Sequence, residues 1–332
     1  MAYEQSGKIE AVDVVNQLIG PVPTAQRLNT LWGYGFGNRG YGQSPLLPNV
    51  NVGDPVLASD WNGMKNLTNT IAQHQATLLS YSVPKDTFAP GINILYNQGL
   101  TKTYIDKIDT NRMSSAVQGN YSVYTVENAF SWTNKLTYTM TATFPTGDSA
   151  RFFFNCGGQL AVRTWQPGYQ SGVPTRLMIS RLAQEAGTIY WSAMAGGSTK
   201  TKIAGVEFAA TTKIGGSGTP GSISGSQDYF QPTTYTSTPV SIFKQTVSNG
   251  VPGYDASFIE VLVNTSGDKG SYGANGNVIT LKLVVDVAPY STSIAAGGIG
   301  YLYVIPPIVS SQSYLTQESW GIPSVVMSVT AQ

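Results

Sequence analysis

Residues 136–144 read LTYTMTATF, and this stretch decides the class of fold. Apolar side chains occupy every second position and threonines occupy the positions between them, which is a strict period of two. Successive side chains of a strand point to opposite faces, so the pattern predicts a strand with one buried face and one exposed face. The buried face would consist of Leu136, Tyr138, Met140, Ala142 and Phe144.

The segments after this strand indicate a β-rich body. Residues 145–148, PTGD, favour a turn, and we expect residues 150–155, ARFFFN, to return the chain as a second strand. Residues 175–186, TRLMISRLAQEA, predict one helix inserted among the strands, ended by Gly187. Later runs rich in β-branched and aromatic residues predict further strands at 206–214, 258–264 and 277–287.

The chain of 332 residues therefore predicts a mainly β protein with a helical N-terminal third. Its body is expected to be an antiparallel β-sandwich or jelly-roll-like fold. The glycine-rich segment 215–225 favours a flexible loop or a boundary. We expect four regions: an N-terminal docking arm (1–50), a helical region with a long helix near 57–79 (51–117), a β domain with one inserted helix (118–205) and a C-terminal β domain (206–332). The alternative to the last two is one large β domain.

Within the helical region, apolar residues recur every seven positions. The stripe of the predicted long helix consists of Leu57, Trp61, Met64, Leu67, Ile71, His74 and Leu78. A seven-residue period is typical of helices that pack side by side in a parallel bundle, so copies of the chain could meet here. The alternative is an ordinary helix that lies on a core of its own chain. His74 is expected to pack or to form a hydrogen bond at a helix contact.

The charge composition limits the classes of partner. Charged residues make up 11% of the chain, against roughly 25% in typical soluble domains. With 19 basic and 18 acidic residues the chain lacks the basic patch that binds nucleic acid, so we expect no nucleic-acid partner. The longest apolar stretch, 299–309, is too short and proline-containing to cross a membrane, and we expect no membrane partner. Weak net charge favours self-association.

The residues that usually carry chemistry are scarce. One His and one Cys, His74 and Cys156, are 82 positions apart in the sequence and exclude a His/Cys zinc site within one chain. Acidic residues occur singly, without a marked pair for acid–base catalysis. We expect no metal, no cofactor and no enzymatic activity, and we expect Cys156 to be a small buried residue.

Residues 31–43, LWGYGFGNRGYGQ, contain the letters of a dinucleotide-binding fingerprint, G-x-G-x-x-G. That fingerprint must follow a strand and open a helix, and neither is expected here. Glycines permit positive φ and close backbone approach, and the aromatic residues between them supply contact area. We therefore interpret the segment as a docking element for a neighbouring chain. Its anchors would be Trp32, Tyr34, Phe36, Arg39 and Tyr41.

Three stretches resemble virion structural proteins of tailed bacteriophages, of the neck, collar, tail or fibre kind. The first is LWGYGFGNRGYGQ followed by VLASDWNGMKNLTNTIAQHQ. The second is TATFPTGDSARFFFNCGGQLAVR, and the third is RLAQEAGTIYWS. Together they cover about residues 20–80 and 136–193.

The resemblance implies a structural subunit that is built in the host cytoplasm and located in the virion. It implies a homo-oligomer, with a trimer favoured, and neighbours among the virion proteins of the neck or tail. Attachment to a host-surface glycan is a further expectation. Two alternatives are a carbohydrate-binding module, in which exposed Tyr and Trp stack on sugars, and a receptor-binding tailspike.

Overall fold

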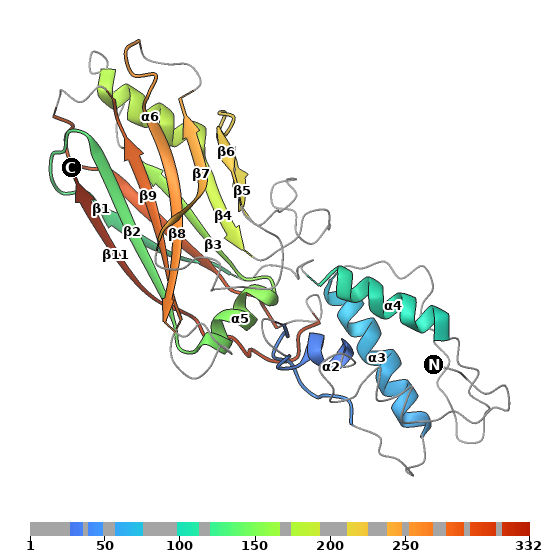
Figure 1. Cartoon of the computed structure of the whole chain (residues 1–332). Helices are drawn as coiled ribbons and strands as arrows, with labels where there is room; N and C mark the ends of the chain where they lie inside the picture. The colour runs from blue at the N-terminus through green and yellow to red at the C-terminus, as the bar shows by residue number, and fades with distance from the viewer. Residues whose placement is uncertain are drawn as a thin grey trace.

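The computed structural model of the chain has two parts, a β body and a smaller helical part beside one end of it (Figure 1). The structure describes residues 27–35, 39–48, 57–75, 98–112, 120–166, 174–192, 211–224, 238–247, 252–267, 277–288, 293–309 and 314–332.

One layer of the body is an antiparallel six-stranded sheet with the strand order β11-β2-β9-β8-β7-β6. The strands span Ser324–Ala331 (β11), Lys135–Phe144 (β2), Asn277–Asp286 (β9), Phe258–Gly267 (β8), Val240–Thr246 (β7) and Ser222–Ile223 (β6). The strand expected from LTYTMTATF is confirmed as β2, and its side chains alternate between buried and half-buried. In the register of the sheet, Met140 lies opposite Met327 of β11 and Leu281 of β9.

The other layer is an antiparallel five-stranded sheet with the order β1-β10-β3-β4-β5. Its strands span Ser122–Glu127 (β1), Ile299–Ile305 (β10), Gln159–Trp165 (β3), Thr188–Ser192 (β4) and Thr211–Ile214 (β5). Each sheet contains strands from both 118–205 and 206–332: β2 pairs with β9, and β10 lies between β1 and β3. The expected boundary near 205 therefore does not separate two β domains, because both ranges build the same sheets.

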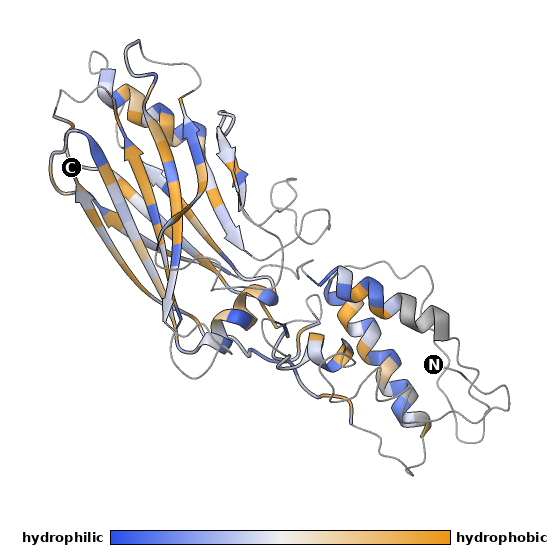
Figure 2. Ribbon diagram, in the orientation of Figure 1, coloured by the Kyte–Doolittle hydropathy of each residue, from blue (hydrophilic) through white to orange (hydrophobic). Residues whose placement is uncertain are grey.

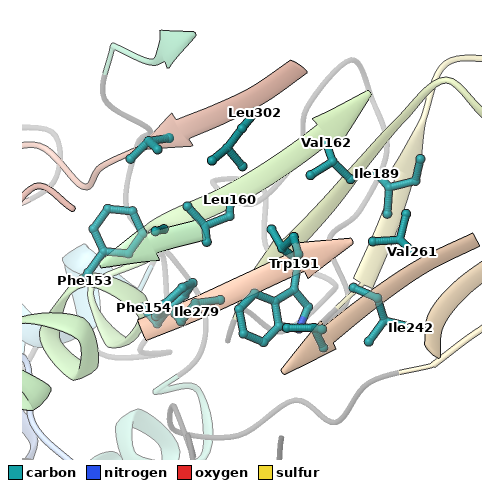
Figure 3. Packing of buried hydrophobic residues seen from close by; sticks show 14 of the residues in the cluster. Phe153, Phe154, Leu160, Val162, Ile189, Trp191, Ile242, Val261, Ile279 and Leu302 are labelled. Atoms are coloured by element: carbon teal, nitrogen blue, oxygen red, sulfur yellow. The ribbon is translucent and has the colours of Figure 1, made fainter. Parts of the chain in front are cut away.

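The two sheets bury a common interior, which Figure 2 shows as apolar stretches along the strands. Close by, Leu160, Val162 and Trp191 of the five-stranded sheet point toward residues of the six-stranded sheet such as Val261 and Ile279 (Figure 3). All five are at most 4% exposed. Two antiparallel sheets that share one apolar interior are consistent with a β-sandwich.

The segment ARFFFN is helical, so the prediction of a returning strand there was wrong. It lies in α5 (Gly147–Asn155), whose first turn is capped by Thr146: the Ser149 N–H donates to Thr146 Oγ1 at 2.9 Å. Phe152, Phe153 and Phe154 are each at most 1% exposed. A helix that is buried on all sides shows no apolar period, and a short apolar run of this kind cannot be told from a buried strand.

Helices α5 and α6 (Pro174–Ala186) lie at opposite ends of the body (Figure 1). Two rings of α5 contact both sheets. The ring centre of Phe153 lies 5.1 Å from that of Phe144 in β2, and the ring centre of Phe154 lies 5.3 Å from that of Trp191 in β4. The helix expected at 175–186 is confirmed as α6, and it packs against β3 of one sheet and β7 and β8 of the other.

The helical part contains α2 (Arg27–Trp32), α3 (Ala58–His74) and α4 (Gln98–Thr110), which pack on one another. The long helix expected near 57–79 corresponds to α3. Residues 1–26 of the expected docking arm and residues 76–97, with Leu78, lie outside the described residues.

Candidate interaction surfaces

The glycine-rich segment folds back on the C-terminal end of α2. The Tyr41 N–H donates to the Leu31 carbonyl at 3.0 Å, and the Gln43 N–H donates to the Trp32 carbonyl at 2.9 Å. The Gly42 N–H donates to the Gly33 carbonyl at 2.7 Å. The last carbonyls of a helix have no partner within it, so these bonds satisfy groups that would otherwise need water.

Two glycines of the fingerprint make this return possible. Gly35 and Gly40 have φ angles of 70° and 98°, which favour glycine. A Cβ atom on Gly35 would collide with the Arg39 carbonyl, and one on Gly40 would collide with the Gly33 carbonyl. Gly35 and Gly40 therefore let the backbone return tightly after a helix, whereas a phosphate-binding fingerprint lies at the start of one.

The five expected docking anchors separate into buried and exposed residues. Trp32 is 1% exposed and Tyr41 is 0% exposed, so both point into their own chain. The Tyr41 ring lies 6.4 Å from that of Trp32 and 5.0 Å from that of His74, and the Tyr41 hydroxyl donates to the Arg112 carbonyl at 2.7 Å. Tyr34, at 63%, and Arg39 are exposed, while Phe36 lies outside the described residues.

The same loop is joined to the β body through α5. Arg151 Nη1 donates to the Tyr34 carbonyl at 2.7 Å and also to the Arg39 carbonyl. Asn155 Nδ2 donates to the Gly40 carbonyl at 3.0 Å, and the Cys156 thiol donates to the Tyr41 carbonyl at 3.2 Å. The Arg151 guanidinium is itself held by Asp148 at 2.8 Å.

A second connection joins the loop to the segment before β11. Gln43 Nε2 donates to the Gln317 carbonyl at 3.0 Å, and Gln43 Oε1 accepts from the Thr316 N–H at 2.9 Å. The Ser319 hydroxyl donates to the Tyr41 carbonyl at 2.9 Å. We call these contacts, together with those of α5, the junction. The hydrogen-bond partners in the junction are up to 278 positions apart in the sequence, and no local sequence pattern predicts their contact.

The stripe of the long helix is also used within the chain. Met64, Leu67, Ile71 and His74 are at most 8% exposed and, apart from His74, belong to the common apolar core. Leu57, at the start of the helix, is 54% exposed, and the side chain of Trp61 and the whole of Leu78 are outside the described residues. The buried residues of the stripe match the second interpretation, a helix that lies on a core of its own chain.

The edge strands on the two sides of the β body differ in length and in charge. On one side lies β11, which has eight residues, SVVMSVTA, and no charged side chain. Gln332, just after β11, exchanges two backbone hydrogen bonds with Lys135 of β2. In an antiparallel pair every second residue bonds to the partner strand, so the residues between them turn their N–H and C=O groups to the free edge. These are Val325, Met327, Val329 and Ala331. Strand β1 of the other sheet runs nearby (Figure 1).

On the opposite side the edge strands are β5, of four residues, and β6, of two. The neighbour of β6, strand β7, has an irregular register between Ser241 and Phe243. Very short edge strands and bulges are two ways in which proteins prevent pairing with other chains, and charged side chains are a third. The β11 side has none of the three along its eight residues.

Burial changes the pKa of two ionisable groups inside the body. Burial raises the pKa of the Cys156 thiol well above its usual range, so the thiolate is disfavoured. Burial also raises the pKa of the Tyr138 phenol to about 12, and a hydrogen bond with Thr164 lowers it in part. Across the part of the chain that the structure describes, no group of three His, Cys, Asp or Glu residues could hold a metal ion. No helix among those residues is long and apolar enough to cross a membrane.

Comparisons with known proteins found no match: no protein-family model, no curated protein and no solved structure is similar to the chain. The geometry of the described residues is therefore the ground for any functional argument, together with the sequence patterns.

Proposed function

We propose that this chain is a structural subunit of a tailed-phage virion, of the neck, collar, tail or fibre kind, which assembles with copies of itself and with neighbouring virion proteins. The observation that carries the proposal is the free edge of β11. A soluble monomer with eight uncharged residues on an open sheet edge tends to aggregate, whereas an assembly subunit can cover that edge with a neighbour.

The composition of the chain supports the same role. With 19 basic and 18 acidic residues, copies of the chain repel each other weakly. The two-sheet body fits the β-sandwich or jelly-roll class, which is common in capsid and attachment modules. The sequence resemblance to phage virion proteins gives the particular setting, with assembly in the host cytoplasm and a trimer as the favoured oligomer.

The junction supports separate roles for the helical part and the β body of the subunit. The hydrogen bonds of Arg151, Asn155 and Gln43, at least, attach the helical part to the β body. A neighbour that fixes the position of one part would therefore also fix the position of the other. Tyr34 and Arg39 of the glycine-rich loop are exposed, so a neighbouring virion protein could contact the loop there. We assign no catalytic role to the chain.

The test is the oligomeric state of the purified chain, measured by light scattering at micromolar concentration. The wild type should have the mass of an oligomer. Val326→Lys places a charge on β11 at a side chain that is 68% exposed, and this variant should shift the mass toward the monomer. The matched control, Val326→Thr, keeps a β-branched uncharged residue and should leave the mass unchanged.

A wild type that is monomeric under these conditions would overturn self-assembly through β11. The setting is tested separately: antibodies against the chain should label the neck or tail in electron micrographs of phage particles. If the chain forms oligomers but no phage particle carries it, the virion assignment is wrong while the assembly role stands.

A further inference from the structure

The outer face of the five-stranded sheet carries an unusual group of aromatic side chains. Leu160, Val162, Ile189 and Leu302 point into the interior (Figure 3), so the residues between them on β3, β4 and β10 face outward. We call the outward group the tyrosine platform. It consists of Tyr121, Arg163, Trp165, Tyr190, Tyr301 and Tyr303.

Tyr303 contacts the rings of two other tyrosines of the platform. The centre of the Tyr303 ring lies 5.7 Å from that of Tyr121, in an edge-to-face arrangement. It lies 6.4 Å from the centre of the Tyr301 ring, and the planes of Tyr303 and Tyr301 are 19° apart. In the register of the sheet, Tyr303 and Tyr190 flank Ala161, which is 1% exposed beneath them. The pKa of Tyr190 is raised by burial and by the nearby phenols of Tyr303 and Tyr121, which agrees with this close grouping.

The platform lies on regular strands and still meets solvent. Tyr121 is 62% exposed and Trp165 is 43% exposed. Paired strands hold side chains more firmly than loops do, so little freedom would be lost when a ligand lies against the rings. Exposed apolar side chains that lie together are typical of binding surfaces, whereas single exposed ones are common on any protein.

Arg163 supplies the one cation of the platform. It lies directly opposite Tyr301 of β10 and two positions from Trp165 on its own strand. Its side chain is exposed, and within the described part of the chain neither a carboxylate nor a ring engages its guanidinium. A guanidinium can bind a carboxylate through two parallel hydrogen bonds.

We propose that the tyrosine platform binds an acidic saccharide, in which a sugar ring lies on the aromatic side chains and a carboxylate pairs with Arg163. The negative faces of aromatic rings attract the polarised C–H bonds of a sugar, and the phenol hydroxyls can bond to its hydroxyls. The Arg163 guanidinium, which no carboxylate of the described residues engages, adds the complementary charge that selects a carboxylate over a neutral sugar. This inference stands independently of the assembly role.

The test uses matched pairs of probes in isothermal titration calorimetry with the full chain. Galacturonic acid hexamer should bind at least about tenfold more tightly than its methyl ester, which has the same rings without the charge. Sialyllactose should likewise bind more tightly than lactose. Because the pairing is exposed, 0.5 M salt should weaken binding of the acidic probes.

Four variants assign the effect to residues. Arg163→Ala should weaken binding of the acidic probe about tenfold and abolish the preference over the methyl ester. Tyr303→Ala should weaken binding of both hexamers, whereas Tyr303→Phe keeps the ring and should retain most of the affinity. Lys282→Ala removes a cation from the other sheet and should change nothing.

Absence of binding by every probe, or equal weakening by Lys282→Ala and Arg163→Ala, would overturn the proposal. If Arg163→Ala instead lowers the oligomeric mass and leaves sugar binding unchanged, the platform is a contact between subunits and the proposal is wrong. Sugar binding by a chain that remains monomeric would support this inference and at the same time count against self-assembly.

Discussion

The glycine-rich loop at 31–43 and the edge strand β11 are opposite cases of an interface signal. The loop contains Trp32 and Tyr41, aromatic residues that suggest contact with a neighbour, yet the structure buries both inside their own chain. Strand β11 has no conspicuous residue at all, yet four of its eight residues turn their backbone groups to an open edge.

The difference shows what each signal measures. Aromatic residues between glycines indicate close packing, but they do not say whether the surface they contact belongs to the same chain or to another. The absence of charge on an edge strand indicates that pairing with another chain is tolerated, because charge is a common way to prevent it. The following predictions test this contrast, from the largest expected change in stability to the smallest.

Trp32→Ala should destabilise the helical part by about 3–5 kcal/mol, because it removes a ring that is 1% exposed and leaves a cavity beside Tyr41. The free energy of unfolding is measured by urea denaturation, with helical circular dichroism as the signal. Tyr34→Ala, from the same loop, is the matched control and should cost about 1 kcal/mol or less, because Tyr34 is 63% exposed. Equal effects would mean that the loop does not bury Trp32.

Stability should fall at alkaline pH through Tyr138. Its pKa is raised from 10.0 to about 12 in the folded chain, so the unfolded chain loses this proton first as the pH rises. The stabilising effect is complete below pH 10 and is lost between pH 10 and 12, by about 2–3 kcal/mol.

Tyr138→Phe removes the titrating hydroxyl, so the part of the alkaline loss that belongs to this residue should vanish. The measurement is the free energy of unfolding of both proteins at pH 9, 10 and 11. Parallel pH profiles of the two proteins would show that Tyr138 is not the group responsible.

Gly40→Ala should cost about 1–3 kcal/mol, because alanine would be strained at a φ of 98° and would meet the Gly33 carbonyl. Gly215→Ala is the control: its φ is 70°, but a Cβ there meets nothing within 4 Å. The difference in thermal stability between the two variants contains the collision with the Gly33 carbonyl and the extra backbone strain at the larger φ of Gly40. If Gly215→Ala is the more destabilising, the loop is not as tightly closed as described.

Val326→Lys should change the free energy of unfolding by no more than about 0.5 kcal/mol, because its side chain is 68% exposed. The measurement should be made at a dilution where the wild type is dissociated, since association itself adds stability. A large loss at that dilution would mean that β11 is held by contacts within the chain and is not a free edge.

The sequence predicted the parts of the fold that depend on local periodicity. The alternation in LTYTMTATF identified β2 and its buried face, and the segment 175–186, ended by Gly187, was correctly expected to be the helix α6. It failed at α5, because three consecutive phenylalanines are buried whether the segment is helix or strand. The division at 205 failed because strand order depends on distant pairing, such as that of β2 with β9.

The interaction surfaces could be predicted only in part. Positive φ and close backbone approach were expected of the glycines and are found at Gly35 and Gly40. The contacts that hold the loop within its own chain involve α5 and Gln317, which lie far away in the sequence. The tyrosine platform gathers Tyr121, which precedes β1, with residues from β3, β4 and β10, and only the register brings Arg163 beside Tyr301. Its aromatic residues were expected to stack on sugars only as a general alternative.

The Cys156 thiol has a practical consequence for studying the junction. It is the one cysteine of the chain, it is buried, and it donates to the Tyr41 carbonyl across the contact between the β body and the loop. Thiol reagents need access to the sulfur and prefer the thiolate, which burial disfavours here. The rate at which a maleimide labels the native chain therefore reports how often the two parts separate, without any engineered probe.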